Sequence, residues 1–244
     1  MYGSSGRIGL AVLDSDITIE PDLARVLPDG VALHASRVRY PHEVSVEALE
    51  EAQHNLKHAV ESLLPIGPKS IVWACTSGSF FKGRGYHEKL LSDLADWSGG
   101  IPATTASNAV VEALSAMNIR RPAVGSPYAP DVNERLYAFL VEYGFNPFPV
   151  RGLFPTIVDD MTLQSVNENE VFEFGLSLDR SEADAVVISC TGLPTSGVVD
   201  QLEERIGKPV VTSNTAILWH ACAIGGICAS YSSRARIFAT QARQ

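Results

Sequence analysis

The apolar positions of the chain fall into short runs that alternate with longer stretches of helical spacing. Short runs, several of them apolar throughout, are typical of parallel strands covered on both faces. They predict strands at Ile8–Leu13, Val31–Val38, Ile71–Ala74, Ala103–Thr105, Pro122–Ser126, Ala185–Ser189 and Val210–Thr212. Spacing of three and four residues predicts helices at Val46–Leu64, Ser107–Met117, Asp131–Tyr143, Glu168–Leu178, Asp200–Ile206 and Thr215–Ala223. This alternation predicts an α/β fold with parallel sheets.

The chain also contains an internal repeat. The segment GIPATTASNA at Gly100–Ala109 resembles GKPVVTSNTA at Gly207–Ala216, and Gly, Pro, Thr and the final Ala match at an offset of 107. We therefore predict two pseudo-symmetric halves, residues 1–119 and 120–244, each a parallel sheet flanked by helices. The C-terminal segment is free to cross back to the first half. Because ligands bind beyond the carboxyl ends of parallel strands, we expect the active site in the cleft between the halves.

Composition narrows the classes of function. The chain has 244 residues, of which 45% are hydrophobic and 19% charged, as in ordinary globular proteins. A formal net charge of −9 argues against nucleic acid or an anionic membrane surface as a partner. No apolar run approaches the ~20 residues of a membrane span, and the N-terminus lacks a signal-peptide pattern. Four cysteines do not suggest a disulfide scaffold, so we expect a cytoplasmic protein, with a homo-oligomer left open.

Two of the predicted strands end in the same way. SIVWACTSGS at Ser70–Ser79 and VVISCTGLPT at Val186–Thr195 each contain an apolar run, a cysteine, a threonine and then small or polar residues. Cys75 and Cys190 therefore belong at the carboxyl ends of strands, one in each half. If the halves face each other, the two thiols approach a shared cleft from opposite sides.

Opposed thiols beside a bound carboxylate suit chemistry at the neighbouring carbon. One thiolate can remove a proton there while the other thiol returns a proton to the opposite face, or a thiolate can add to a C=C bond and leave after rotation. The hydroxyls and backbone N–H groups of Thr76, Ser77 and Thr191 are candidate partners for the developing negative charge. A lone cysteine at a strand end is more often a core residue, but two matching Cys-Thr settings favour the catalytic interpretation.

Other candidates have simpler interpretations. Cys222 and Cys228 lie in the apolar stretch WHACAIGGICA, and we expect both to be core residues. His54 and His58 are four residues apart, as metal ligands on one helix face can be, but they fall on a polar face without a third ligand. We therefore predict no metal site.

At the two Cys-Thr motifs the chain resembles the aspartate/glutamate racemase superfamily. Over nearly its whole length it is similar to arylmalonate decarboxylase, the maleate cis–trans isomerases and the ectoine-utilisation racemase-like proteins. The segments that carry the closer resemblance are TSGSFFKG at Thr76–Gly83, DVNERLYAFL at Asp131–Leu140 with the preceding Tyr128, and SCTGLPT at Ser189–Thr195. The resemblance implies two pseudo-symmetric α/β halves and no cofactor.

The resemblance also assigns roles to individual residues. It implies that Thr76, Ser77 and Tyr128 bind the substrate carboxylate or the developing enolate. It further implies that Cys190 transfers a proton, with the Thr191 amide beside it.

Two departures from the decarboxylase and isomerase patterns bear on the reaction. The decarboxylase has glycine where this chain has Cys75, whereas racemases and maleate isomerases keep both cysteines. Asp14 and Asp16 occupy the place where maleate isomerases carry an Asn-Thr-Thr segment that contacts a carboxylate. Because an aspartate there would repel a substrate carboxylate, we expect Asp16 to face an amino or hydroxyl group of the substrate. The alternative is that one aspartate caps the following helix while the other is solvated.

These observations predict a cofactor-independent racemase or cis–trans isomerase of a small carboxylic acid, with Cys75 and Cys190 as its catalytic residues. The substrate-binding candidates are Asp16, Thr76, Ser77, Tyr128 and Thr191. An arylmalonate-type decarboxylase is the first alternative. A non-catalytic carboxylate-binding protein is the second.

Overall fold

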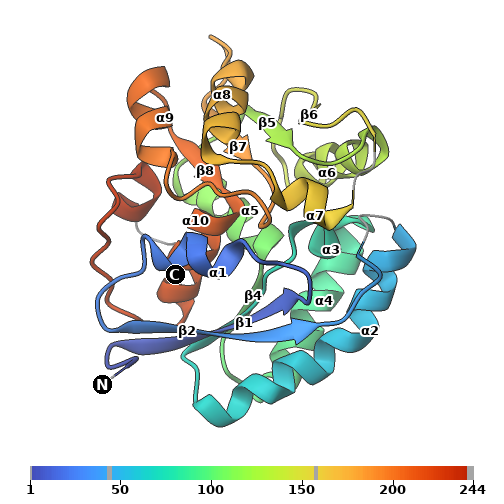
Figure 1. The fold of residues 1–244 in the computed structure, drawn as a ribbon, viewed down its shortest axis with the longest axis vertical. Coiled ribbons are helices and arrows are strands. Elements are labelled where there is room, and N and C mark those ends of the chain that lie inside the picture. Colours follow the sequence, from blue (N-terminus) through green and yellow to red (C-terminus); the bar gives the residue numbers. More distant parts are fainter. Residues whose placement is uncertain (1, 43–45, 157–158, 241–244) are drawn as a thin grey trace.

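The computed structural model describes residues 2–42, 46–156 and 159–240, which contain two four-stranded parallel sheets. The first sheet has the order β2-β1-β3-β4 and the second the order β6-β5-β7-β8, so the two halves share one strand order (Figure 1). The strands are β1 (Gly6–Leu13), β2 (Val31–Val38), β3 (Ser70–Trp73), β4 (Ala103–Thr105), β5 (Pro122–Ser126), β6 (Arg151–Gly152), β7 (Ala185–Ile188) and β8 (Val210–Thr212). The predicted fold class is confirmed.

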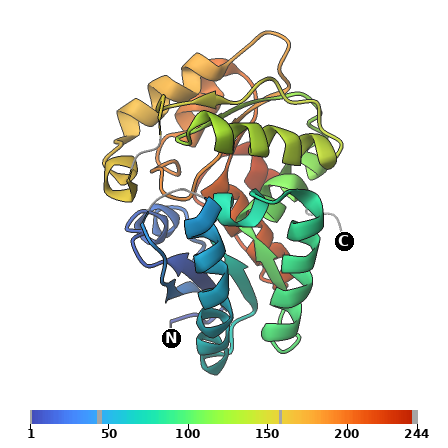
Figure 2. The ribbon, with the colours of Figure 1, turned by 90° about the vertical axis from the view of Figure 1, so that its right-hand side faces the viewer.

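Helices flank each sheet and separate the two lobes seen in Figure 2. In the first half α2 packs on β1 and β2, and α4 packs on β4; in the second half α8 packs on β5 and β7, and α9 on β8. The helices are α1 (Ile19–Ala24), α2 (Val46–Leu63), α3 (Thr76–Phe80), α4 (Gly83–Trp97), α5 (Ala106–Ala116), α6 (Pro130–Glu142), α7 (Asp160–Gln164), α8 (Glu168–Leu178), α9 (Val199–Ile206) and α10 (Ser213–Ile224), with 3₁₀ turns η1 (Leu64–Ile66) and η2 (Arg236–Ala239).

The internal repeat of the sequence corresponds to a strand followed by a helix cap. Thr105 ends β4 and its side chain accepts a hydrogen bond from the Asn108 N–H, and Thr212 ends β8 and accepts one from the Thr215 N–H. A threonine at this position satisfies an N–H group that the helix leaves free, and such a cap is worth roughly 1 kcal/mol. The repeat therefore marks the starts of α5 and α10.

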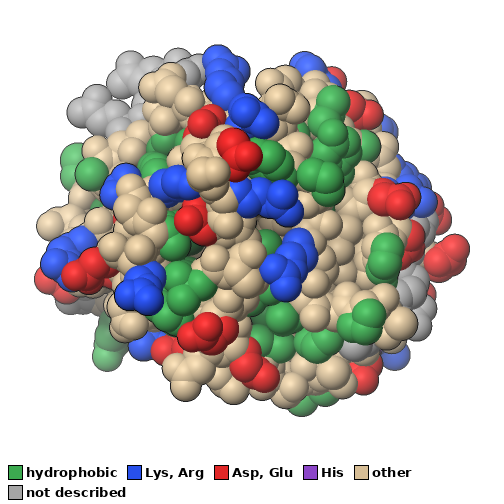
Figure 3. All heavy atoms as spheres, turned by 90° about the horizontal axis from the view of Figure 1, so that it is seen from above, with side chains coloured by type: hydrophobic (Ala, Val, Ile, Leu, Met, Phe, Trp, Pro, Cys, Tyr) green, Lys and Arg blue, Asp and Glu red, His purple; other side chains and the backbone are tan. Residues whose placement is uncertain are grey.

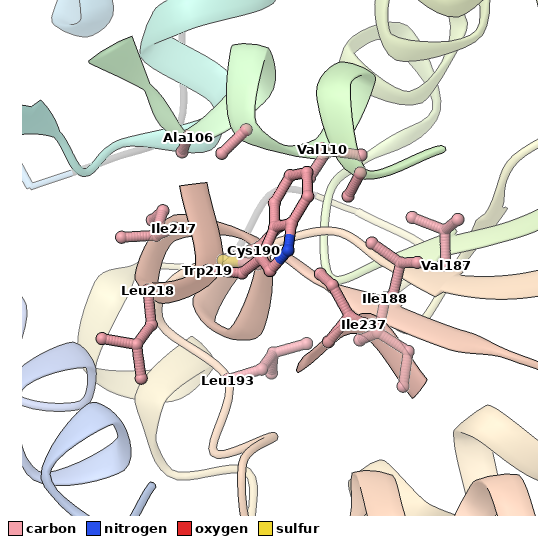
Figure 4. Packing of buried hydrophobic residues seen from close by; sticks show 14 of the residues in the cluster. Ala106, Val110, Val187, Ile188, Cys190, Leu193, Ile217, Leu218, Trp219 and Ile237 are labelled. Atoms are coloured by element: carbon pink, nitrogen blue, oxygen red, sulfur yellow. The ribbon is translucent and has the colours of Figure 1, made fainter. Parts of the chain in front are cut away.

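Helices α5 and α10 pack against each other between the two sheets. Helix α10 also contacts β3 and β4 of the first sheet, while α5 contacts β8 of the second. Every residue from Ser213 to Cys222 is buried, which is why α10 lacks a polar face. Figure 4 shows Val110 of α5, Trp219 of α10 and Val187 of β7 in this shared core.

The chain returns to the first half after α10. A Cβ placed on Gly6 of β1 would lie 2.8 Å from Cδ1 of Ile227, so the segment after α10 lies against the first strand. The two sheets are separated in sequence between Thr105 and Pro122, but α5 and α10 each contact both sheets. A boundary at residues 119 and 120 stays a prediction.

Several elements were not predicted, and each is short or carries a weak pattern. Of the strands in the described residues, the one that was missed, β6, has only two residues, Arg151 and Gly152. Helix α4 begins with Gly83 and Gly85, and His87 occupies one position of its buried face, so both its start and its apolar spacing were obscured. Helices α1, α3 and α7 have five or six residues each, too few to establish a period.

The surface mixes charges of both signs. On the face shown in Figure 3, Lys and Arg side chains lie among Asp and Glu side chains, although the formal net charge of the chain is −9. Within the described residues, no helix combines the length and the apolar character needed to cross a membrane.

Candidate active site

The carboxyl ends of both sheets border one cavity, with about 40 Å³ of space open to the centre of a water molecule. The loops after β1, β2 and β3 approach it from the first half, and the loops after β5, β6 and β7 from the second. All seven site residues predicted from the sequence line this cavity: Asp16, Cys75, Thr76, Ser77, Tyr128, Cys190 and Thr191. The structure thus brings every one of them together, while their roles stay predictions.

Cys75 sits where strand β3 turns into helix α3. Its backbone is extended, and its side chain caps the helix because Sγ accepts a hydrogen bond from the Gly78 N–H at 3.3 Å. A Cβ on Gly78 would lie 2.9 Å from that sulfur, so glycine is needed for the approach. The Ser79 hydroxyl donates to the carbonyl oxygens of Cys75 and Thr76, at 3.0 and 2.9 Å. Local hydrogen bonds therefore fix the first thiol.

Cys190 lies in an irregular turn after β7. Its Sγ accepts a hydrogen bond from the Gly192 N–H at 3.3 Å. The amide of Asn214, at the start of α10, donates to the carbonyl oxygens of Thr191 and Leu193 at 3.3 and 3.2 Å. The second turn is therefore held from α10, more than twenty residues away in sequence.

Hydroxyl groups connect the two turns. The Tyr128 side chain lines the cavity beside both turns, and Cys190 of the second half and Ser77 of the first both affect its pKa. The Thr76 hydroxyl donates to Ser213 at the start of α10, at 3.0 Å. A bound carboxylate in this cavity would therefore find hydroxyl donors from both halves.

Asp16 combines the two roles that the sequence left as alternatives. Its Oδ1 accepts hydrogen bonds from the N–H groups of Thr18 and Ile19, at 2.8 and 3.0 Å, at the start of α1. It also lines the cavity, where Thr191 opposes the rise in its pKa. Asp14 lies outside the cavity lining and pairs with His42 at 3.1 Å.

Burial governs the electrostatics of the site. It raises the pKa of Cys75 and of Cys190 to about 12, and it also raises the pKa of Tyr128 and of Asp16. The carboxylates of Asp160 and Asp16 raise the pKa of Cys75 further. Hydrogen bonds oppose the shift, from Gly78 and Ser77 at Cys75 and from Tyr128 and Gly192 at Cys190. Both thiols are therefore protonated at neutral pH.

Four polar residues of the site were missed from the sequence: Ser15, Tyr40, Asp160 and Gln164. Asp160 starts α7, and it accepts hydrogen bonds from the hydroxyls of Tyr40 and Ser15 in the other half. Ser15 and Tyr40 each follow within two residues of a strand end, at Leu13 and Val38, which is the signal that could have found them. Asp160 follows a strand too short to be predicted.

Two further expectations can be compared with the structure. Cys222 is buried as predicted, but Cys228 is exposed; it follows α10 in a segment that lies at the surface, so the prediction of a core residue was wrong there. His54 and His58 are exposed on α2, as predicted. Among the described residues, no group of three or more His, Cys, Asp and Glu side chains is arranged to hold a metal ion.

The chain is similar to known proteins over most of its length. The family model described as arylmalonate decarboxylase matches residues 8–238. A maleate isomerase of Nocardia farcinica is 32% identical over 86% of this chain and 86% of its own, and an arylmalonate decarboxylase of Bordetella bronchiseptica is 30% identical over 91% and 92%.

Solved structures give the same result. The first is an arylmalonate decarboxylase variant, liganded, in which cysteine replaces a glycine and serine a cysteine; its TM-score is 0.87 at 28% identity, over 96% of this chain and 98% of that one. The second is a cysteine-to-serine variant of the Nocardia farcinica maleate cis–trans isomerase with a covalently bound succinylcysteine intermediate; its TM-score is 0.87 at 26% identity, with the same coverage. The chain therefore belongs to the arylmalonate decarboxylase family, whose members include maleate isomerases and use cysteine in catalysis.

Proposed function

We propose that the protein is a cofactor-independent racemase or cis–trans isomerase that acts at the carbon next to a carboxylate of a small acid. One observation carries the proposal. Cys75 and Cys190, from the ends of corresponding strands in the two halves, line the same cavity. A reaction that needs a proton donor or acceptor on each face of a carbon requires this arrangement.

In the racemase form of the proposal, one thiolate takes the proton from the carbon beside the carboxylate. The electron pair of the broken C–H bond moves into the carboxylate to give an enediolate, and the other thiol donates its proton to the opposite face. The hydroxyls of Thr76, Ser77 and Tyr128 line the cavity where they can stabilise the enediolate. At the end of a turnover the thiol and the thiolate have exchanged places.

In the isomerase form, one thiolate adds to a carbon of the C=C bond and the electron pair moves into the adjacent carboxylate. Rotation about the resulting single bond and loss of the thiolate then give the other geometric isomer. The succinylcysteine in the Nocardia farcinica relative supports this route, because a cysteine is covalently bound to the acid there; the succinyl group is the adduct after a proton has joined its second carbon. The proposal covers both forms, since each needs a thiolate and a bound carboxylate.

Formation of the thiolate is the difficult step. With a pKa of about 12, only about one thiol in ten thousand is ionised at pH 8. The hydrogen bonds that Gly78 and Gly192 donate to the sulfurs favour the thiolate, and Tyr128 does the same at Cys190. Substrate binding has to supply the remaining stabilisation.

A decarboxylase is the second candidate, and the side chains of Leu13, Leu49 and Leu163 favour it. They give the cavity an apolar part, and an apolar pocket destabilises a carboxylate that leaves as carbon dioxide. Cys75 argues the other way, because it supplies a second thiol that a one-sided protonation does not need. A protein that binds a carboxylate without turnover is the third candidate.

The proposal also includes the class of substrate and the compartment. Asp16, in contact with the cavity, favours a substrate with an amino or hydroxyl group over a plain dicarboxylate. Cys75 and Cys190 are free thiols, and a catalytic thiol has to stay reduced, which favours the cytoplasm.

The test is incubation of the protein with a panel of acids in deuterated water, followed by NMR. The panel holds maleate, phenylmalonate, and the D and L forms of the common amino acids and their 2-hydroxy analogues. Deuterium at the carbon beside the carboxylate with loss of optical purity, or fumarate from maleate, supports the proposal. Release of carbon dioxide from phenylmalonate without either result indicates a decarboxylase, and saturable binding without turnover indicates a binding protein.

A further inference from the structure

The cavity contains a second carboxylate for which the proposed reaction has no role. Asp160 is the first residue of α7, in the half opposite to Asp16, and only 7% of its surface is exposed. Both aspartates line the cavity. Neither of the two reaction forms needs an anion at the position of Asp160.

Contacts with the first half fix the position of Asp160 across the cavity. Its Oδ2 accepts hydrogen bonds from the Tyr40 hydroxyl, at 2.5 Å, and from the Ser15 hydroxyl. At the other end of α7, the Gln164 amide donates to the Ser15 carbonyl oxygen at 3.0 Å and accepts from the Ile17 N–H at 2.6 Å. Asp160, at the first position of α7, and Gln164, at the last, therefore both form hydrogen bonds with the loop after β1.

The two carboxylate oxygens of Asp160 differ in their contacts. In the described part of the chain, Oδ1 accepts no hydrogen bond, although the residue is more than nine-tenths buried and lines the cavity. The fully enclosed polar side-chain atoms without a partner, among the described residues, are Ser70 Oγ and Asn214 Oδ1, so Asp160 Oδ1 is not sealed off in the protein. A carboxylate oxygen at the wall of a cavity can accept a hydrogen bond from a ligand there.

The charge around this oxygen specifies the donor. Of the described residues that line the cavity, none is Lys, Arg or His, whereas two are aspartates. A basic side chain lies outside the lining, where the Arg37 guanidinium donates to the Asp16 carbonyl oxygen at 2.7 Å. A cationic donor would complement two carboxylates, while a second carboxylate on the ligand would be repelled by them.

We propose that Asp160, together with Asp16, binds an ammonium group of the substrate, so that the substrate is an amino-substituted carboxylic acid. The inference rests on the proposed function. The carboxylate of such a substrate would meet the hydroxyls of Thr76, Ser77 and Tyr128, and its ammonium group the two aspartates. Asp160 is then a specificity-determining residue, and Tyr40 and Ser15 are the residues that position it.

Ammonium binding would also help to ionise Cys75. The carboxylates of Asp160 and Asp16 contribute to the raised pKa of that thiol. A positive charge between them offsets their effect and favours the thiolate, whereas a dicarboxylate adds negative charge and opposes it. Recognition of the amino group and activation of the thiol are therefore coupled, and a hydroxy acid of the same shape gains only the recognition of its hydroxyl.

The test compares Asp160→Asn with Asp159→Asn. Asp159 is the neighbouring residue and caps α7 through the Thr162 N–H at 2.9 Å, but it lies outside the cavity lining, and asparagine caps equally well. The control thus removes the same charge one residue away. Affinity is measured by calorimetry for the D and L common amino acids, their 2-hydroxy analogues and maleate, and kcat and KM are measured for those that react.

We expect Asp160→Asn to weaken the binding of the best amino acid roughly ten- to a hundredfold, mainly as an increase in KM or Kd. The same substitution should change the affinity for the 2-hydroxy analogue by less than about threefold and increase the affinity for maleate. Asp159→Asn should leave all of these values within about twofold. Tyr40→Phe should follow Asp160→Asn in direction with a smaller effect.

The inference is overturned if the parent binds no amino acid more tightly than Asp160→Asn does. It is also overturned if maleate is the best ligand and the substitution leaves its affinity unchanged. These outcomes are separate from failure of the proposed function. Racemisation of hydroxy acids, or isomerisation of maleate, without any effect of Asp160→Asn would leave the two-thiol reaction standing. Tight, Asp160-dependent binding of an amino acid without deuteration would support the ammonium site and overturn the reaction.

Discussion

The two cysteine turns begin alike and are supported differently. Cys75 is fixed by N–H and hydroxyl groups within four residues, and it belongs to a hydrophobic cluster of the first half. Cys190 belongs to the cluster that contains α5 and α10, and its turn is held by Asn214. Asn214 is in turn bound to Asp22, 192 residues away in sequence. One thiol therefore depends on its own segment, and the other depends on the association of the two halves.

The largest expected effect comes from removing either thiol. Cys75→Ser and Cys190→Ser should each abolish racemisation or isomerisation, because a serine hydroxyl ionises far less readily than a thiol; a loss of at least about a hundredfold is expected for an acid–base group. Turnover is measured on the acid identified in deuterated water. Cys222→Ser is the control, since Cys222 is also buried but lies outside the cavity lining. Near-normal turnover in either active-site variant would contradict the two-thiol mechanism.

Cys75→Gly should separate the two turns functionally. It removes the thiol of the first half and leaves the turn of Cys190 intact, because the hydrogen bonds of that turn involve Gly192 and Asn214 and not Cys75. We expect racemisation to be lost while deuterium exchange continues on one face through Cys190. Racemisation at the parental rate would show that Cys75 is not the second acid–base group.

The long-range support of Cys190 can be broken at Asp22. This buried carboxylate accepts hydrogen bonds from the Ser196 N–H and hydroxyl, the Thr195 hydroxyl and the Asn214 amide. Asp22→Asn places an NH₂ group where only acceptors fit, and we expect the free energy of unfolding to fall by about 1–3 kcal/mol. Exchange on the Cys190 face should decrease more than exchange on the Cys75 face.

The control for that substitution is Glu20→Gln on the same helix. Glu20 is more than one-third exposed and pairs with Arg37 at the surface, so its loss should change stability by less than about 1 kcal/mol. Equal loss of exchange on both faces in Asp22→Asn would indicate a general effect on the fold and not support of one turn.

The smallest effect concerns pH, and here the two thiols should behave alike. Burial raises the pKa of each to about 12, above the ordinary thiol value of ~8.5. Their contribution to stability is therefore complete below pH ~8.5 and is lost as the pH rises from there through 12. Between pH 8 and 10, denaturant unfolding should show that the parent loses about 1–2 kcal/mol more than Cys75→Ser or Cys190→Ser does. A pH dependence unchanged by either substitution would contradict the burial of a neutral thiol.

Most of the site could be predicted from the sequence because it follows strand ends. The apolar runs place Cys75, Tyr128 and Cys190 beyond the carboxyl edges of parallel strands, and the repeat around Thr105 and Thr212 indicates two halves. The resemblance to known enzymes then supplied expected roles for the hydroxyls. These features are local, and a local pattern can be recognised in a single sequence.

The rest depends on contacts that no local pattern encodes. Asp160 follows the two-residue strand β6 and meets Tyr40 across 120 residues. Asn214 and Asp22 join only after the halves associate. The two interpretations of Asp16 looked like alternatives because helix capping uses one carboxylate oxygen while the rest of the side chain lines the cavity.

The most direct test of the central claim is stereospecific exchange in the two single-thiol variants. The D and L forms of the acid that the parent racemises are incubated separately in deuterated water with Cys75→Ser and with Cys190→Ser, and deuterium is followed by NMR. If the thiols work from opposite faces, one variant exchanges only the D form and the other only the L form, each with retention of configuration. Exchange of the same form by both variants, or of both forms by one, would contradict the account.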